Sequence, residues 1–342
     1  MELWHDRILV LDFGSQYTQL IARRIREAQV YSQILPCTVP LATVLAYRPK
    51  GIVLSGGPSS VYDKKAPSVS KQLFEQGIPI LGICYGMQLV THLQGGEVEK
   101  APHREFGRAE LTLDDRSDLF KGIGTRGSTV VWMSHGDRIE RMPPGFRSIA
   151  HTDNSPIAAM KRHDARQRIY CLQFHPEVAH TTEGATILKN FVYDICGCKP
   201  TWTMRSYVDT AVEQIRQQVG TERVICALSG GVDSSVAAAL THRAVGDQLT
   251  CIFVDNGVLR TGERDQVEKT FASQMHLNMR ILDRTSQFLT GLKSVTDPER
   301  KRKIIGRLFI KNFEVESKKL KGIKYLVQGT LYPDVIESVS FK

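Results

Sequence analysis

A cysteine in a glycine-flanked turn is the first residue whose setting suggests chemistry. The string Gly-Ile-Cys-Tyr-Gly at residues 82–86 follows an apolar segment and precedes a helical pattern that begins near Met87. A Gly-x-nucleophile-x-Gly turn between a strand and a helix projects its central side chain, and the helix N-terminus stabilises a thiolate. Cys84 is therefore a candidate nucleophile. The alternative is a small cysteine buried in a tight turn.

A base and a carboxylate that could serve this thiol occur together further along the chain. Gln-Phe-His-Pro-Glu at residues 173–177 follows a strand-like segment, residues 168–172. A thiol nucleophile needs a base within hydrogen-bond reach and a third group that orients the imidazole. We therefore predict a catalytic triad of Cys84, His175 and Glu177.

A glycine pair after another buried strand offers backbone donors. The string Ser-Gly-Gly-Pro occupies residues 55–58. Its unhindered N–H groups suit a developing oxyanion, so Gly57 and Tyr85 are predicted to form an oxyanion hole. A flexible turn is the alternative interpretation.

Together these three strings resemble the class I glutamine amidotransferase family, over residues 7 to about 196. The resemblance implies that substrate glutamine is held near Gln88 and near residues 133–137. Asp137 would meet the glutamine ammonium, while backbone groups of Ser134 and His135 would hold its carboxylate. A polar turn explains the Gly-Asp pair at residues 136–137 equally well.

A second glycine-rich loop lies between an apolar strand and an alanine-rich helix. Its glycines free backbone N–H groups to wrap a phosphate, and the following helix start adds donors. The loop lacks the spacing and lysine of a Walker A motif and the spacing of a dinucleotide fold. It resembles instead the loop of ATP pyrophosphatases, which cleave ATP between the α and β phosphates. The predicted ATP-binding residues of the loop are Ser229, Gly230, Gly231, Val232, Asp233, Ser234 and Ser235.

The next strand ends at the sheet edge where open α/β sheets bind ligands. By resemblance Val254 would line the adenine pocket, and Asp255 would contact ribose or magnesium. A β-turn acid is the alternative for Asp255. Mg²⁺ is expected with ATP because the polyphosphate charge must be neutralised; apart from Asp255, the sequence indicates no ligand for it.

The net charge of +9 comes mainly from one segment, residues 284–324, which holds twelve Lys or Arg and four Asp or Glu. Such a segment suits a polyphosphate, a nucleic-acid backbone or a solvated helix face. Asp297 and Pro298 are typical of a capped helix start, and an apolar stripe follows at residues 304, 305, 308, 309 and 313. We predict that this helix is a lid over pyrophosphate, with contacts from Arg300, Lys301 and Lys303, and that no nucleic acid binds.

With the residue 328–338 segment included, essentially the whole chain resembles the family of glutamine-hydrolysing GMP synthetases. The resemblance implies glutamine, ATP and xanthosine monophosphate (XMP) as substrates. It also implies a homodimer formed through a smaller C-terminal domain, which in this family follows the point where the present sequence stops. Two rivals are a glutamine-fed ligase with another acceptor and a nucleotide-sensing module with a silent cysteine.

The elements that must position these residues form two α/β domains. Apolar runs alternate with amphipathic segments before residue 105, which predicts a mixed, mostly parallel sheet with flanking helices. Shorter segments between residues 105 and 173 favour antiparallel strands. The same alternation restarts after Gly197 and Pro200, which predicts a second α/β domain with a parallel sheet. We place the domains at residues 1–198 and 199–342.

The N-terminus has no secretion signal, and no apolar run approaches the roughly 20 residues that span a bilayer. The seven cysteines are odd in number and scattered, which favours reduced thiols. A cytoplasmic protein without a membrane partner is therefore expected. Cys196 and Cys198 lack a second pair at zinc spacing and are interpreted as linker residues.

Overall fold

A mixed sheet lies in the first of two units, which divide between Thr203 and Met204. The structure is a computed structural model that describes residues 6–164 and 166–329, with the backbone alone for residues 101–103. The predicted domain boundary after residue 198 remains a prediction.

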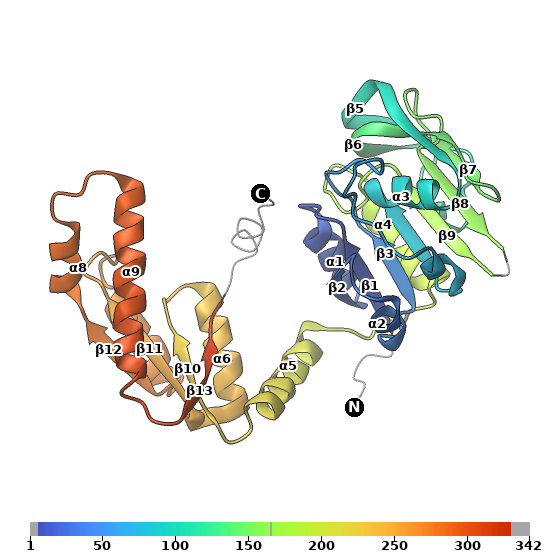
Figure 1. The fold of residues 1–342 in the computed structure, drawn as a ribbon. Helices are drawn as coiled ribbons and strands as arrows, with labels where there is room; N and C mark the ends of the chain where they lie inside the picture. The colour runs from blue at the N-terminus through green and yellow to red at the C-terminus, as the bar shows by residue number, and fades with distance from the viewer. Residues whose placement is uncertain (1–5, 165, 330–342) are drawn as a thin grey trace. The chain divides into compact units, whose positions relative to one another are not determined.

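In the described residues the first sheet has nine strands in the order β2-β1-β3-β4-β9-β8-β7-β5-β6 (Figure 1). The strands from β2 to β9 in this order pair in parallel, and those from β9 to β6 pair antiparallel. The predicted mixed sheet is confirmed, although its antiparallel part begins at Glu97 instead of residue 105. The bounds are β1 (Arg7–Asp12), β2 (Tyr31–Pro36), β3 (Gly51–Leu54), β4 (Ile80–Ile83), β5 (Glu97–Leu113), β6 (Ser128–Arg141), β7 (Arg147–His151), β8 (Ala159–His163) and β9 (Arg168–Leu172).

Helices cover both faces of this sheet because its central strands are apolar on both sides. Along β1, Ile8 and Val10 pack with α1 and α4, whereas Leu9 and Leu11 pack with α2 and α3. These helical elements are α1 (Thr18–Glu27), α2 (Leu41–Ala46), α3 (Tyr85–Leu93), α4 (Gly184–Lys189), the π-helix η3 (Asn190–Ile195) and the short 3₁₀ helices η1 (Lys71–Glu75) and η2 (Asp118–Phe120).

Cys196 and Cys198 belong to the core of the first unit, so their interpretation as linker residues is wrong. Both are buried within the cluster that covers one face of the sheet. A Cβ atom at Gly51 would collide with the Cys196 Sγ, which shows how closely this sulfur approaches β3. Burial raises the pKa of both thiols, that of Cys198 to about 12.

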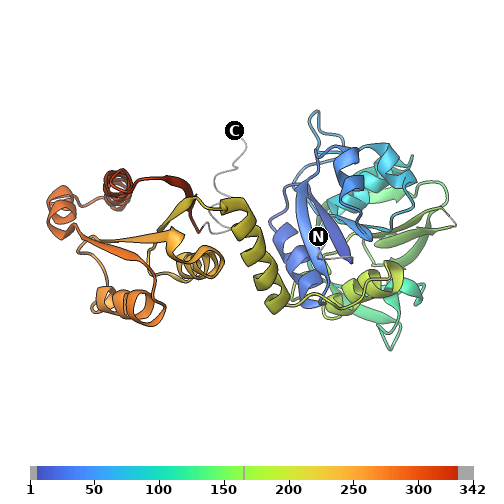
Figure 2. The ribbon, with the colours of Figure 1, turned by 90° about the horizontal axis from the view of Figure 1, so that it is seen from below.

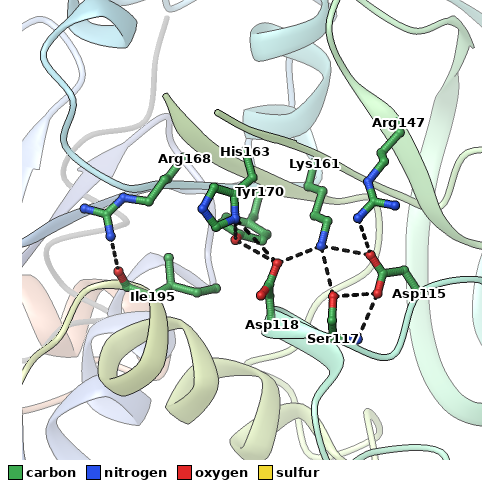
Figure 3. A network of polar contacts seen from close by, with 9 residues as sticks. All are labelled: Asp115, Ser117, Asp118, Arg147, Lys161, His163, Arg168, Tyr170 and Ile195. Atoms are coloured by element: carbon green, nitrogen blue, oxygen red, sulfur yellow. Dashed lines mark hydrogen bonds and ion pairs between the residues drawn. The ribbon is translucent and has the colours of Figure 1, made fainter. Parts of the chain in front are cut away.

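A buried lysine holds the loop between β5 and η2 (Figure 3). The Lys161 Nζ lies 2.6 Å from Asp118 Oδ2 and 2.8 Å from Asp115 Oδ2. It also donates to the Ser117 hydroxyl at 3.1 Å, and the Tyr170 hydroxyl donates to Asp118 at 3.3 Å. The lysine side chain is 5% exposed. Burial alone would raise the pKa values of both carboxyls, but hydrogen bonds, chiefly from Lys161, outweigh it and lower them.

Replacing Lys161 with methionine is expected to lower the free energy of unfolding by about 3–5 kcal/mol, because two acids lose their buried cation. The two carboxyls have lower pKa values in the folded protein than in the unfolded chain, where the pKa is about 3.9. Their ionised forms therefore stabilise the fold at pH values above about 3.9. The difference between wild type and variant should therefore shrink as the pH falls below about 4. Urea titrations at pH 7 and pH 3.5 measure both effects. Arg147→Met is the matched control: its pair with Asp115 is exposed on the arginine side, so a loss of at most about 1 kcal/mol is expected. Equal losses in the two variants would contradict the assignment.

The second unit is built on a parallel sheet of four strands in its described part, in the order β12-β11-β10-β13. The predicted second α/β fold with a parallel sheet is confirmed. Cys226 and Phe253 face a cluster with α5, α6 and α7, whereas Ile252 and Val254 face α8 and α9. Figure 2 shows α7 and α9 on opposite sides of this sheet. The bounds are α5 (Met204–Val219), β10 (Arg223–Ala227), α6 (Val232–Val245), η4 (Gly246–Gln248), β11 (Leu249–Asp255), α7 (Glu263–Val267), the π-helix η5 (Glu268–Gln274), β12 (Met279–Asp283), α8 (Thr285–Leu292), α9 (Pro298–Ser317) and β13 (Ile323–Val327).

The part of the chain that the structure describes contains no helix with both the length and the apolar character needed to cross a membrane.

Candidate active site

The turn between β4 and α3 presents Cys84. α3 begins at Tyr85, two residues before the predicted start, so Cys84 directly precedes the first helical residue. Its φ of 52° and ψ of −106° are unusual for a residue with a side chain, and its N–H donates to the Leu172 carbonyl at 2.7 Å. A Cβ atom at Gly82 would lie 2.8 Å from the Gly86 carbonyl. Glycine is therefore required at position 82, because the backbone of Gly86 comes too close to leave room for a Cβ atom.

His175 and Glu177 are adjacent in space and buried. The His175 Nδ1 lies 2.8 Å from Glu177 Oε1, with 4% and 0% of the two residues exposed. Burial lowers the pKa of His175, but its hydrogen bonds to Cys84 and Glu177 outweigh burial and raise the pKa to about 10. The arrangement therefore favours a protonated imidazole at neutral pH.

Contacts from distant elements fix the histidine segment. The His175 N–H donates to the Trp132 carbonyl of β6 at 3.1 Å, and the Thr181 hydroxyl donates to the His175 carbonyl at 2.6 Å. The Arg24 side chain of α1 donates to the Glu177 carbonyl at 3.0 Å. The Tyr17 ring meets the imidazole edge to face at a centroid distance of 5.2 Å. Nothing in the spacing of these four residues indicates that they meet here.

A cavity of about 530 Å³ opens beside Cys84. Seven predicted residues line it together: Gly57, Cys84, Gln88, Ser134, His135, Asp137 and His175. Tyr85 lies next to the cavity; its hydroxyl donates to the Pro67 carbonyl at 2.6 Å, and its amide is the first of α3, where helix N–H groups lack intrahelical partners. Two further lining residues, Pro58 and Gly136, belong to the predicted strings at residues 55–58 and 133–137, and the sequence did not indicate the remaining ones, which are Gly14, Ser15, Gln16, Tyr17, Ser59, Ser60 and Phe106.

Asp137 lies within strand β6, so the alternative of a polar turn is wrong. The Ser60 hydroxyl donates to Asp137 Oδ2 at 2.9 Å, across 77 residues of sequence. The Gln88 amide donates to the Asp137 carbonyl at 3.1 Å. The carboxylate is thus held at the cavity wall, where a ligand ammonium could reach it.

The glycine-rich loop of the second unit leads into α6, which begins at Val232, so the last four residues of the predicted loop, Val232 to Ser235, are helical. Gly230 has a φ of +81°, which glycine adopts without steric cost. The hydroxyls of Ser229 and Ser234 lie 2.9 Å apart, and the Ser235 hydroxyl donates to the Gly231 carbonyl at 2.6 Å. Asp233 lies in the first turn of α6.

A cavity of about 380 Å³ begins at Gly230 and continues along α7; Arg260, which precedes α7, and Glu263, its first residue, line it. Of the predicted loop residues, Gly230 alone is among its lining residues in the described chain. Gly329 lies against the backbone of Asp233. The rest of the predicted 328–338 segment, residues 330–338, lies outside the described residues.

Val254 and Asp255 take different positions at the end of β11. The Val254 side chain is buried in the cluster under α9, with Leu282 and Phe288. Asp255 Oδ2 pairs with Arg264 at 3.2 Å, and its Oδ1 accepts the Gly257 N–H at 3.0 Å. No group of three or more His, Cys, Asp or Glu side chains in the described residues could hold a metal ion.

The predicted start of α9 is confirmed, since Asp297 Oδ1 accepts the Arg300 N–H at 2.7 Å and Pro298 opens the helix. Ile305, Leu308, Phe309 and Phe313 pack against the cluster below. Lys303 lies 3.7 Å from Glu299 and is largely exposed. The basic side chains thus occupy the free side of a packed helix.

Comparisons with known proteins match both units. Residues 9–195 match the family model "Glutamine amidotransferase class-I", and residues 204–303 match the family model "NAD synthase". The GMP synthase (glutamine-hydrolyzing) of Carboxydothermus hydrogenoformans is 54% identical over 333 residues, which cover 97% of this chain and 65% of that protein. The enzyme of the same name from Geobacillus kaustophilus is 55% identical over 333 residues, covering 97% and 64%. The chain thus spans about two thirds of the length of these relatives.

Solved structures resemble part of the chain. A putative GMP synthase component from Thermoplasma acidophilum has a TM-score of 0.47 at 29% identity, covering 56% of this chain and 94% of that one. A glutamine amidotransferase from Thermotoga maritima has a TM-score of 0.42 at 20% identity, covering 57% and 87%.

Proposed function

Because the chain belongs to the class-I glutamine amidotransferase family, we propose that it hydrolyses glutamine and that the ammonia serves an ATP-dependent conversion of XMP to GMP. The proposed glutamine hydrolysis rests on one observation: Cys84, His175 and Glu177 lie together, buried, beside a cavity. The second half is supported by the glycine-rich loop and by the two GMP synthase relatives.

The glutaminase steps use this chain's own groups. The Cys84 thiolate attacks the carboxamide carbon of glutamine, and the N–H groups of Gly57 and Tyr85 stabilise the oxyanion. The His175 imidazolium gives its proton to the departing ammonia, which leaves a glutamyl thioester. The neutral imidazole then takes a proton from water, which attacks the thioester and releases glutamate. Glu177 holds the imidazole in the required orientation.

The ATP half of the reaction transfers an adenylyl group. The oxygen at C2 of XMP attacks the α-phosphorus of ATP, pyrophosphate leaves, and ammonia then displaces AMP. The loop from Ser229 to Ser235 would wrap the phosphates. Two observations do not fit a preformed magnesium site. Asp255 is already paired with Arg264, and the described residues contain no cluster of three or more His, Cys, Asp or Glu side chains that could hold a metal ion. Mg²⁺ is therefore proposed only as a companion of the ATP phosphates, with no step assigned to it.

The cellular setting is proposed from the thiols. All seven cysteines are free thiols in the structure, which supports a reducing, cytoplasmic location. Homodimerisation is implied by resemblance alone and remains a proposal. The basic segment is assigned to phosphate and not to nucleic acid.

The test is to supply glutamine, ATP and XMP together and singly, and to measure glutamate, AMP, pyrophosphate and GMP. Glutamate release from glutamine by the protein would support the first half, and its absence would overturn it. XMP-dependent exchange of pyrophosphate into ATP would support the acceptor. Exchange elicited by a different acceptor, and not by XMP, would redirect the proposal to another glutamine-fed ligase.

The double variant Lys301→Ala/Lys303→Ala is expected to bind pyrophosphate about tenfold more weakly or worse, because each lost charge-assisted bond contributes about 1.5–3 kcal/mol when desolvated. Equilibrium dialysis with labelled pyrophosphate measures the effect. Lys311→Ala/Lys318→Ala is the matched control, since Lys311 lies further along the same helix and Lys318 directly follows its last residue. The glutaminase rate should stay unchanged in both double variants. If both double variants bind pyrophosphate with equal affinity, Lys301 and Lys303 do not contact pyrophosphate and belong to a solvated helix face.

A further inference from the structure

One large apolar side chain, that of Phe106, lines the Cys84 cavity where the cavity opens to solvent. Phe106 is 63% exposed, and it is the only exposed phenylalanine among the described residues. The other residues that line the cavity are mostly polar or small: glycines, serines, glutamines, histidines, Asp137, Tyr17, Pro58 and Cys84. Phe106 therefore supplies the largest wholly apolar surface in an otherwise polar cavity. An exposed apolar ring at such a place calls for a partner in the cavity.

The course of strand β5 directs Phe106 toward the cavity. Phe106 pairs with Ser134 on β6, which also lines the cavity, and residues directly opposite each other in an antiparallel pair project to the same face. The strand is irregular on both sides of Phe106. The register shifts between Lys100 and Glu105, and Gly107 has a φ of +100°, which favours glycine. Irregularities of this kind aim a side chain at a site.

Phe106 lies beside the stretch of the cavity that the middle of a glutamine molecule would occupy. The Cys84 thiol donates to the Ser134 carbonyl at 3.7 Å, so a carboxamide at the thiol lies next to Ser134. Asp137, predicted to meet the ammonium, follows further along the same strand. Two methylene groups join the carboxamide of glutamine to its α-carbon. Polar groups cannot stabilise these methylene groups, but the ring of Phe106 can cover them and exclude water.

The Phe106 ring also separates the Cys84 cavity from a second cavity. The second cavity has a volume of about 430 Å³, and Arg104, Arg108 and Asn154 are among the residues that line it. Of the residues that the structure describes, Phe106 alone lines both cavities. An alanine at position 106 would let the two cavities merge. Water and charged side chains would then reach the place that the methylene groups occupy.

We propose that Phe106 is a substrate-binding residue whose ring covers the two methylene groups of glutamine and closes the Cys84 cavity against the second cavity. The proposal rests on the proposed glutaminase function for its substrate. The ring contacts a part of the substrate that does not react, so it stabilises the bound substrate and the transition state alike. Loss of the ring should therefore raise KM and leave kcat nearly unchanged.

Steady-state kinetics of glutamate release test the proposal first. Phe106→Ala should raise the KM for glutamine about tenfold, with kcat within about threefold, because two methylene groups lose their apolar cover. Phe106→Leu keeps an apolar side chain at this position and should recover most of the loss. Arg108→Ala is the matched control: Arg108 lies on the same strand, is exposed and lines the second cavity, but it does not line the Cys84 cavity. Its KM should equal that of wild type.

Chemical modification of Cys84 gives a second measurement that does not depend on turnover. The first reagent is the analogue of glutamine in which a diazoketone replaces the carboxamide, and the second is iodoacetamide, which has no methylene chain to cover. Mass spectrometry follows the modification of Cys84 by each reagent. Phe106→Ala should react with the glutamine analogue about tenfold more slowly than wild type at low reagent concentration. Its reaction with iodoacetamide should be as fast as in wild type, or faster.

The outcomes separate this inference from the function on which it rests. An unchanged KM in Phe106→Ala, or an equal rise of KM in Phe106→Ala and Arg108→Ala, would overturn it. Equal slowing of both reagents in Phe106→Ala would also overturn it, because that result would mean general damage to the site. If the wild-type protein released no glutamate, the proposed function would fail. The difference between the two reagents would then still decide whether Phe106 covers the chain of a bound amino acid.

Discussion

Replacing Cys84 with alanine is expected to lower glutamate release from glutamine by about 10⁴-fold or more, because no other group beside the cavity can form the thioester. The loss should appear in kcat. Alanine keeps the Cβ atom and the unusual backbone of the turn, so the free energy of unfolding should change little. A coupled glutamate assay measures the rate, and mass spectrometry of the protein after brief exposure to glutamine should find the glutamyl adduct in wild type alone.

Cys37→Ala is the matched control for this variant, because Cys37 is also buried in the first unit but does not line the cavity. Its glutaminase rate should equal that of wild type. Binding of ATP should be the same in all three proteins. Retained glutamine hydrolysis in Cys84→Ala would remove Cys84 from the mechanism.

His175→Ala should lower kcat/KM by about 10⁴-fold or more, and Glu177→Gln should cost roughly a hundredfold less. The reason is that an amide at position 177 can still accept the Nδ1–H bond and orient the ring, whereas no neighbour can replace the imidazole. The pH profile adds a signature. The pKa of about 10 for His175 depends in part on Glu177, so the alkaline decline of kcat/KM should move to lower pH in Glu177→Gln.

The measurement is kcat/KM for glutamine from pH 6 to pH 10.5. The control is Glu183→Gln, a nearby acid that bonds the Gly124 N–H and lies outside the cavity lining. Its profile should match that of wild type. Equal losses in His175→Ala and Glu177→Gln would mean that the carboxylate charge, and not ring orientation, is what Glu177 supplies.

Much of the fold could be predicted from apolar periodicity. The strand predicted at residues 168–172 has the bounds of β9, and the helix predicted to start at Asp297 and Pro298 is α9. Strand β2 was not predicted because Tyr31–Pro36 is a half-exposed edge strand with little alternation. The short helix α8 was missed because eight residues carry too little periodicity to register. The π-helices η3 and η5 directly continue α4 and α7. Apolar periodicity predicts one continuous helix in each place and does not reveal the change of helix type.

Part of the candidate site could likewise be predicted from the sequence, and part could not. Residues within one short string, such as the pair His175 and Glu177, could be predicted because the chain itself brings them together. Ser60 could not, because it lines the cavity from a loop that is 77 residues away in sequence from its partner Asp137. A contact over such a separation leaves no trace in the spacing of the residues. The interpretation of Cys196 and Cys198 as linker residues failed because a Gly-Pro break marks a change of direction and not the edge of a core.

The backbone of Cys84 has a consequence for how this sequence would respond to selection. A side chain at a φ of 52° and ψ of −106° costs about 1–3 kcal/mol that glycine at the same position would not incur. A library screened only for thermal tolerance should therefore enrich glycine at position 84, and the enriched proteins would be more robust and inert. At this position a gain in stability is a loss of catalytic activity. Any selection of stabilised variants of this chain must therefore also measure activity at every round.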